Sequence, residues 1–164
     1  RGLGDVYKRQ YLTSIREKQL PLDEACAYTH MAYYLRWCVE HDLVSEEFLR
    51  RQQDIVNRLR QTPEAVDLRA FLREELSGML LLPLFSEDGQ AFTLYYYDWE
   101  EPSYLSDLRQ YALSALSLEL PAAEDARREA YLFLPCREET YRAVAALIEA
   151  RWNDWAELGD APEL

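Results

Sequence analysis

Apolar residues recur at steps of three and four along most of the chain, the spacing that places them on one face of an α-helix. Residues 25–39 are apolar on nearly all sides, which is typical of a helix buried in the centre of a domain, and Asp23 is a candidate N-cap for it. A second clear stripe lies near the end of the chain, where Gly159 is expected to end the helix. This stripe consists of Tyr141, Val144, Ile148, Trp152 and Trp155.

Capping residues and apolar spacing predict three further helices between these two. Ser45 is a candidate N-cap before an apolar stripe over residues 48–59, and residues 103–116 show the same helical spacing. Thr62–Pro63 predicts a third start, because proline suits the first position of a helix, and Gly78 is expected to end that helix.

Two segments fit more than one kind of structure. In residues 79–97, two apolar runs flank Asp88–Gly89, a dipeptide that favours the turn of a β-hairpin. Ser86 can instead cap a helix there, and we favour the helix. Residues 131–134 are the best strand candidate, although one strand cannot stand alone, and residues 122–130 fit a charged linker or a short helix.

These elements predict a mainly α fold, a compact single-domain bundle of about five to six helices over residues 20–157. One short β-hairpin or strand pair stays open as an alternative, and residues 158–164 are expected to be a tail. Residues 1–10 (RGLGDVYKRQ) resemble the translated end of a transposon adapter used to prepare sequencing libraries. We therefore expect them to be non-native, and residues 11–19 to be an N-terminal remnant.

Charge and composition limit the kinds of partner and the cellular compartment that we expect for this chain. The chain has 30 acidic and 18 basic residues, a formal net charge of −12, so we expect no nucleic acid as a partner. The longest apolar run, residues 79–85, is too short to span a membrane. Cys26, Cys38 and Cys136 are an odd number without disulfide spacing, which fits a cytoplasmic protein, and we expect no cofactor.

Aromatic residues near the middle of the chain suggest a binding surface. Consecutive tyrosines cannot all face the core of a regular helix or strand, so some of them should be exposed. They lead into an acidic turn that contains a tryptophan, and tyrosine and tryptophan are preferred anchors at protein interfaces. The candidate partner-binding residues are Tyr95, Tyr96, Tyr97, Asp98, Trp99, Glu100 and Glu101. The alternative is that Trp99 folds back onto the core.

Histidine and cysteine pairs on the first helix suggest a different chemistry. Cys26 and His30 are four residues apart and Cys38 and His41 three apart, so each pair would share one helical face. Such a pair can ligate zinc or form a Cys-His nucleophile, but the two pairs lie about 16 Å apart along a helix and cannot share one ion. The simpler interpretation is a buried helix in which these residues only pack.

Three separated stretches carry recognisable motifs. They are residues 22–37 (LDEACAYTHMAYYLRW), residues 87–96 (EDGQAFTLYY), and residues 138–141 (EETY) together with 148–155 (IEARWNDW). In this order they resemble a family of uncharacterised bacterial domains of unknown function. The resemblance implies one intact helical domain and draws attention to Thr29, His30 and Trp37, but it implies no substrate. The chain departs from the family at Tyr141, where the family has tryptophan.

Two functions follow from these observations. The first is a small acidic cytoplasmic protein-binding module, of the immunity or regulatory kind, that binds a partner with a basic surface and has no catalytic activity. The second is a metal-binding or hydrolytic enzyme domain centred on Cys26 and His30. We favour the first, because the sequence contains no nucleotide-binding or serine-nucleophile signature.

Overall fold

The computed structural model describes residues 15, 20, 22–97 and 103–160, and the regular secondary structure of this part is all α-helical or 3-10 helical. The predicted α fold is therefore confirmed, and the alternative of a β-hairpin is wrong, since the described residues contain one isolated β-bridge and no strand. The predicted non-native segment 1–10 lies outside the described residues, as does the remnant 11–19 apart from Ile15.

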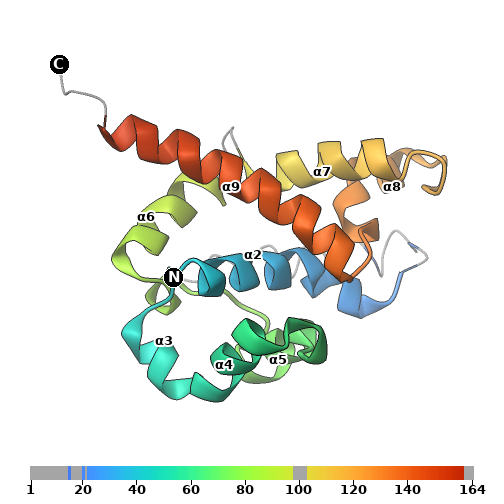
Figure 1. The fold of residues 1–164 in the computed structure, drawn as a ribbon. Helices are drawn as coiled ribbons and strands as arrows, with labels where there is room; N and C mark the ends of the chain where they lie inside the picture. The colour runs from blue at the N-terminus through green and yellow to red at the C-terminus, as the bar shows by residue number, and fades with distance from the viewer. Residues whose placement is uncertain (1–14, 16–19, 21, 98–102, 161–164) are drawn as a thin grey trace.

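The helices follow one another with short connections (Figure 1). In chain order, with η for 3-10 helices, they are η1 (Glu24–Tyr28), α2 (Thr29–Glu40), α3 (Glu46–Arg51), α4 (Gln53–Gln61), η2 (Pro63–Ala65), α5 (Leu68–Glu75), η3 (Leu82–Leu84), α6 (Glu87–Tyr96), α7 (Tyr104–Ala115), α8 (Glu124–Arg128), η4 (Ala130–Phe133) and α9 (Glu138–Asp160).

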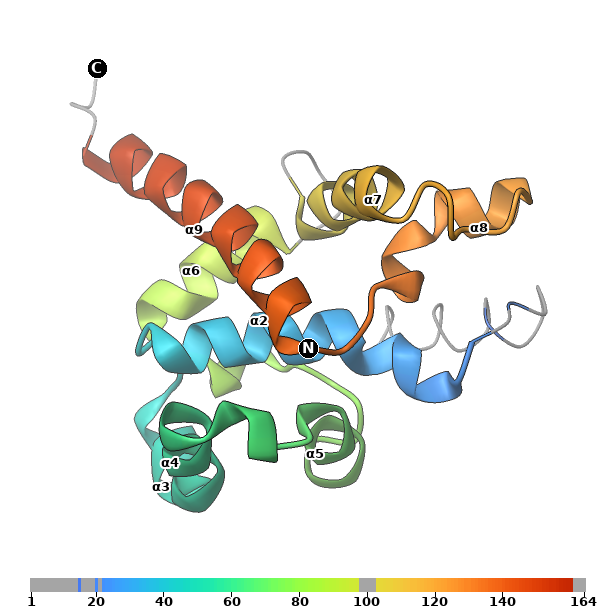
Figure 2. The same cartoon turned by 45° about the vertical axis from the view of Figure 1, so that its right-hand side comes forward.

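Helix α2 lies in the middle of the molecule, as its apolar surface predicts. All of its residues are buried except Arg36 and Glu40. Helix α9 crosses on one side of α2, while α4 and α5 lie on the other (Figures 1 and 2). Because a helix that is apolar on nearly every side must be covered on nearly every side, the other elements are arranged around α2.

Helix α9 is the longest element, with 23 residues. Its predicted stripe is confirmed: Tyr141, Val144 and Ile148 are buried, and Trp152 and Trp155 pack against the core while staying partly exposed. The helix runs through Gly159 to Asp160, so the predicted end is wrong; a glycine inside a helix costs only about 1 kcal/mol and need not end it. Among the described helices, none is long and apolar enough to cross a membrane.

Side-chain caps account for most of the helix starts. Asp23, Ser45 and Ser86 each accept a hydrogen bond from a backbone N–H in the first turn that follows, as predicted, and Ser103 caps α7 in the same way. The predicted start at Thr62–Pro63 yields only the short η2.

The helix predicted after Thr62 begins later than expected. The β-branched Val66 takes an extended conformation, which interrupts the helix, and α5 starts at Leu68 with Asp67 as its cap. The helix predicted over residues 48–59 is likewise divided at Gln52 into α3 and α4.

The strand predicted at residues 131–134 is also wrong. This segment forms η4, in which Ala130, Tyr131 and Leu132 are buried. Its apolar run is buried against α7, so it needs no neighbouring strand to be covered. Residues 124–128 form the short helix α8, one of the two predicted alternatives for that region.

One close backbone contact fixes where α6 begins. The connection between α2 and α3 runs beside the start of α6, where Ser86 N–H donates to the Leu43 carbonyl at 2.9 Å. Gly89 lies in the first turn of α6, and a Cβ atom at this position would stand 2.2 Å from the Leu43 carbonyl oxygen. The backbone can approach this closely only because residue 89 is glycine.

We predict that Gly89→Ala destabilises the protein by about 1–3 kcal/mol, because the added methyl group forces the Leu43 carbonyl and α6 apart. Urea unfolding followed by circular dichroism measures the loss. Ala91→Gly, at an exposed position of the same helix, is the control and should cost about 1 kcal/mol from helix propensity alone. A Gly89→Ala protein as stable as the wild type, or more stable, would contradict the close contact.

Candidate functional site

The candidate pair Cys26 and His30 does not form the arrangement that its spacing predicts. Cys26 lies in η1, a 3-10 helix, where residues four apart are offset by about 120° and do not share a face. Cys26 is half-buried, whereas His30 is 1% exposed. In the described part of the chain, no three His, Cys, Asp or Glu side chains gather so that they could hold a metal ion.

His30 is surrounded by aromatic residues in the core. Its ring meets the ring of Tyr131 edge-on at 5.7 Å between centroids, and its backbone carbonyl accepts a hydrogen bond from the Tyr104 hydroxyl at 2.6 Å. Burial lowers the pKa of His30 to about 3. The imidazole is therefore neutral at physiological pH and has no access to solvent.

The second pair, Cys38 and His41, is also separated. Cys38 is fully buried, and burial raises the pKa of its thiol. His41 is exposed and stacks on the Trp37 ring at 4.1 Å between centroids. Its Nδ1 lies 2.8 Å from the Trp37 carbonyl oxygen and its Nε2 lies 3.1 Å from Glu149 Oε2 on α9. His41 therefore connects the end of α2 to α9, while Cys38 lies in the core, and the two do not form a shared site.

The motif residues Thr29, His30 and Trp37 all belong to the core, with at most 2% of each exposed. Trp37 also contacts the rings of Phe92 on α6 and Trp152 on α9, at 5.7 and 5.9 Å between centroids. Since these residues come from the separate motifs of the sequence, we infer that the motifs consist largely of residues that pack the core of the domain.

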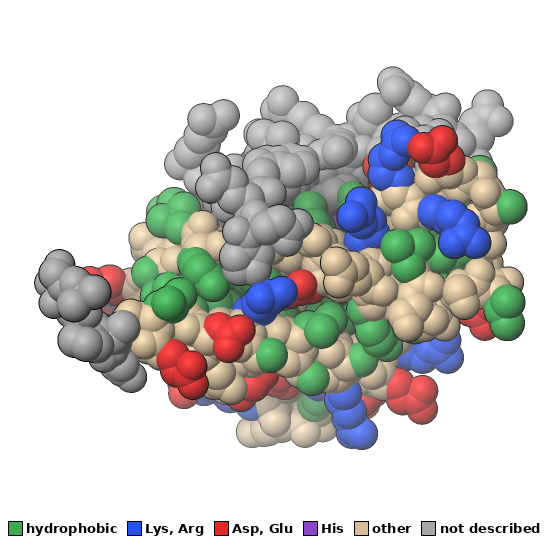
Figure 3. Space-filling model, turned by 90° about the horizontal axis from the view of Figure 1, so that it is seen from above, with side chains coloured by type: hydrophobic (Ala, Val, Ile, Leu, Met, Phe, Trp, Pro, Cys, Tyr) green, Lys and Arg blue, Asp and Glu red, His purple; other side chains and the backbone are tan. Residues whose placement is uncertain are grey.

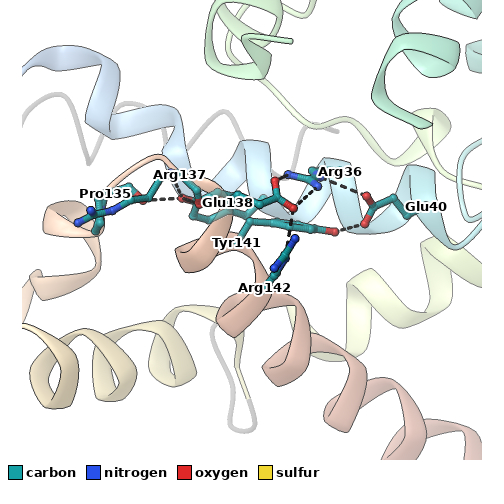
Figure 4. Close-up of polar contacts among 8 residues, drawn as sticks. Arg36, Glu40, Pro135, Arg137, Glu138, Tyr141 and Arg142 are labelled. Carbon is teal, nitrogen blue, oxygen red and sulfur yellow. Dashed lines mark hydrogen bonds and ion pairs between the residues drawn. The ribbon is translucent and has the colours of Figure 1, made fainter. Parts of the chain in front are cut away.

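A polar network joins the only two α2 residues that are not buried to the start of α9 (Figure 4). Arg36 donates two hydrogen bonds to Glu138, at 2.8 and 3.0 Å, and a third to Glu40 at 3.1 Å. The Arg36 guanidinium lies 3.7 Å from the centre of the Tyr141 ring, and the Tyr141 hydroxyl donates to Glu40. The hydrogen bonds from Arg36 lower the pKa of Glu138.

The sequence alone does not indicate this whole network. The four-residue spacing of Arg36 and Glu40 is a local signal that could have indicated half of it. Glu138 is 102 positions from Arg36, and no local pattern indicates that contact. In this network each nitrogen of the Arg36 guanidinium donates to a carboxylate and the group lies over a tyrosine ring, an arrangement that supports the α2–α9 junction.

The tyrosines predicted to face a partner are arranged differently. Tyr96 and Tyr97 are buried, so the expectation that they form a contact surface is wrong for these two residues, while Tyr95 is half-buried. Asp98–Glu101, including Trp99, lies outside the described residues. Tyr97 is the C-cap of α6, where its backbone N–H still donates to the Thr93 carbonyl, and its ring packs on Tyr34 at 4.9 Å between centroids.

Tyr96 has a polar partner at the edge of the core. Its hydroxyl donates to Asp107 Oδ2 at 2.6 Å. Arg151 on α9 donates two hydrogen bonds to the same carboxylate, at 2.9 and 3.0 Å. These contacts hold α6, α7 and α9 together and satisfy the charge of Arg151.

An aromatic and acidic surface lies where α6 meets the C-terminal part of α9. Trp152 and Trp155 pack together at 5.1 Å between centroids, and Trp155 contacts Phe92 of α6 at 5.7 Å. Tyr95 lies beside Phe92, and Leu158 is 63% exposed. We call this surface, with the exposed acidic residues of the same two helix segments, the α6–α9 surface. Its residues are Tyr95, Trp152, Trp155, Leu158, Glu87, Asp88, Asp154 and Glu157.

The neutral, buried state of His30 predicts a pH dependence of stability. The histidine pKa is about 6.5 in an unfolded chain and about 3 in the folded protein, so the unfolded chain takes up a proton first as the pH falls. Stability from this group is full above about pH 6.5 and falls toward pH 3, by at most about 1.4 kcal/mol per pH unit.

Urea unfolding between about pH 6.5 and 4.5 measures this slope. His30→Gln should reduce the slope of unfolding free energy against pH by up to about 1.4 kcal/mol per pH unit, whatever its effect on absolute stability. Equal slopes for the wild type and His30→Gln would show that His30 is protonated in the folded protein.

The comparisons with known proteins identify a family and no activity. A family model described as Domain of unknown function (DUF7832) matches residues 7–121. No curated protein and no solved structure matches the chain significantly. The matched range contains the first two motif stretches, and the third, residues 138–155, lies beyond it. The match covers well over half of the chain, and the chain belongs to this family of domains of unknown function.

Proposed function

We propose that this domain binds a protein with a basic surface, and that the α6–α9 surface makes the contact. The observation that carries the proposal is the combination there of partly exposed aromatic rings with acidic side chains. Trp152, Trp155 and Tyr95 are partly exposed beside the exposed Leu158. Tryptophan and tyrosine are the residues that most often anchor protein interfaces.

The charge of the surface favours a basic partner. Residues 87–96 and 152–160 contain acidic residues and no lysine or arginine. Arg151 directly precedes the second of these ranges, and its charge is neutralised by its two hydrogen bonds to Asp107. In Figure 3, hydrophobic and acidic side chains neighbour one another toward the C-terminal end of α9, while Lys and Arg side chains gather toward α8. Such a field accelerates association with a basic protein and makes it sensitive to salt.

The aromatic residues of the surface are held rigidly. Trp152 lies between Trp37 and Trp155, and Phe92 supports it from α6 at 5.1 Å between centroids. A side chain fixed by packing loses little conformational entropy when a partner covers it, so these rings are suited to be anchors.

Affinity capture from a native bacterial lysate, followed by mass spectrometry and calorimetry with the purified partner, tests the proposal. We expect one basic protein, bound in stoichiometric amount at low salt and weakened at high salt. The double variant Glu157→Lys/Leu158→Ser should weaken the measured affinity at least about tenfold, because it reverses a charge and removes an exposed apolar contact.

The matched control is Glu119→Lys/Leu118→Ser, which makes the same two changes at an exposed Leu-Glu pair after α7. It should bind as the wild type does. An equal loss of affinity for the partner in both double variants would indicate a nonspecific charge effect. A partner whose binding ignores salt and the α6–α9 variant would contradict the proposal, as would self-association of the chain through this surface in sedimentation experiments.

A further inference from the structure

A pocket of about 300 Å³ lies against α2, on the side covered by α4 and α5 in Figure 2. Leu59, Val66 and Leu68 give it an apolar wall. Tyr33 and Cys136 contribute polar atoms from α2 and from the connection between η4 and α9. The pocket lies away from the α6–α9 surface, so its role is independent of the function proposed above.

Arg69 of α5 lines this pocket without an ionic partner. It is partly buried, and it makes no ion pair with any carboxylate in the described part of the chain. Its Nε is buried and has no acceptor there, and its Nη1 makes only a long hydrogen bond, 3.5 Å, to Thr29 Oγ1. The other two partly buried arginines of the core edge, Arg36 and Arg151, each hold a carboxylate with two hydrogen bonds.

The unused donors of Arg69 indicate what the pocket accepts. A carboxylate is the group that matches the paired N–H donors of a guanidinium, and Arg69 lines the pocket without a carboxylate partner among the described residues. The charge of Arg69 also reaches the Cys136 thiol: burial raises the pKa of Cys136, and Arg69 opposes this. The positive charge of Arg69 therefore favours a negatively charged group inside the pocket.

We propose that the pocket binds a small aliphatic carboxylate, with the carboxylate on Arg69 and the aliphatic group against Leu59, Val66 and Leu68. A free aliphatic amino acid and a short branched fatty acid share this chemistry. Glu64 and Asp67 also line the pocket, and both are exposed. They would receive the ammonium group of an amino acid.

Isothermal titration calorimetry with three probes of similar shape tests the proposal. The probes are L-leucine, 4-methylpentanoate, which lacks the ammonium group, and 3-methylbutylamine, which lacks the carboxylate. We expect saturable binding of at least one carboxylate and none of the amine. Leucine alone would identify an amino acid site, and equal binding of both acids would identify a fatty acid site. No binding of either acid, or equal binding of the amine, would overturn the proposal.

Arg69→Met should weaken binding of the carboxylate about tenfold or more. It should lower the thermal midpoint little, because the long bond to Thr29 is the one hydrogen bond of Arg69 in the described part of the chain. Arg73→Met, one turn further along α5 and exposed, is the control and should bind normally. Unchanged affinity in Arg69→Met would overturn the assignment, and a much lower midpoint would show that Arg69 serves the fold.

Two further measurements test whether the ammonium group of the ligand is recognised and whether the ligand lies in this pocket. Asp67→Asn keeps a good N-cap for α5 while removing the charge, so it should weaken leucine and spare 4-methylpentanoate if the ammonium group is recognised. In a Cys26→Ser background, a bound carboxylate should slow the reaction of Cys136 with N-ethylmaleimide, because Cys136 is exposed and lines the pocket. An unchanged reaction rate at saturating ligand would place the binding elsewhere.

Discussion

The burial of α2 is the constraint on which the rest of this structure depends. A helix of twelve residues with ten buried positions cannot rest on a surface and must be enclosed. Helices α4 and α5 enclose it on one side and α9 on the other, and the rings of Tyr104 and Tyr131 reach it from α7 and η4. The sequence distance between these elements is large, so the domain can become stable only when most of the chain has folded.

The two residues of α2 that are not fully buried also help to hold the surrounding helices in place. Arg36 and Glu40 meet Glu138 and Tyr141 where α9 begins, and this network fixes how α9 crosses the central helix (Figure 4). A second network, Tyr96 with Asp107 and Arg151, fixes the other half of α9 against α6 and α7. In both, a partly buried arginine holds a carboxylate with two hydrogen bonds, so that the two charges satisfy each other.

The residues that make this chain recognisable are thus mostly structural. His30 is neutral and buried, Trp37 joins three helices, and Gly89 allows α6 to approach the Leu43 carbonyl. Function must then be sought where side chains are available to other molecules. The two places that we propose, the α6–α9 surface and the Arg69 pocket, both lie outside this set of core residues.

Local chemistry made much of the fold predictable. The caps at Asp23, Ser45, Ser86 and Ser103 involve residues no more than three positions apart, and the stripe of α9 is visible in the sequence alone.

Two of the errors come from contact between distant residues. The segment 131–134 resembles a strand in sequence but is buried against α7, and Tyr97, which the sequence suggests is exposed, packs on Tyr34 of α2. The lack of an ion pair at Arg69 among the described residues could not be predicted either, because it depends on where the fold places the carboxylates.

Native-state hydrogen exchange of the α2 backbone amides tests the central claim most directly. If the other elements depend on α2, its amides between Met31 and Val39 should exchange only through global unfolding, with the highest opening free energy in the domain. Amides in the C-terminal part of α9, beyond Trp155, should open at lower free energy. Exchange of the α2 amides at a lower free energy than those of α7 or α9 would contradict the account, because the domain would then hold together without its central helix.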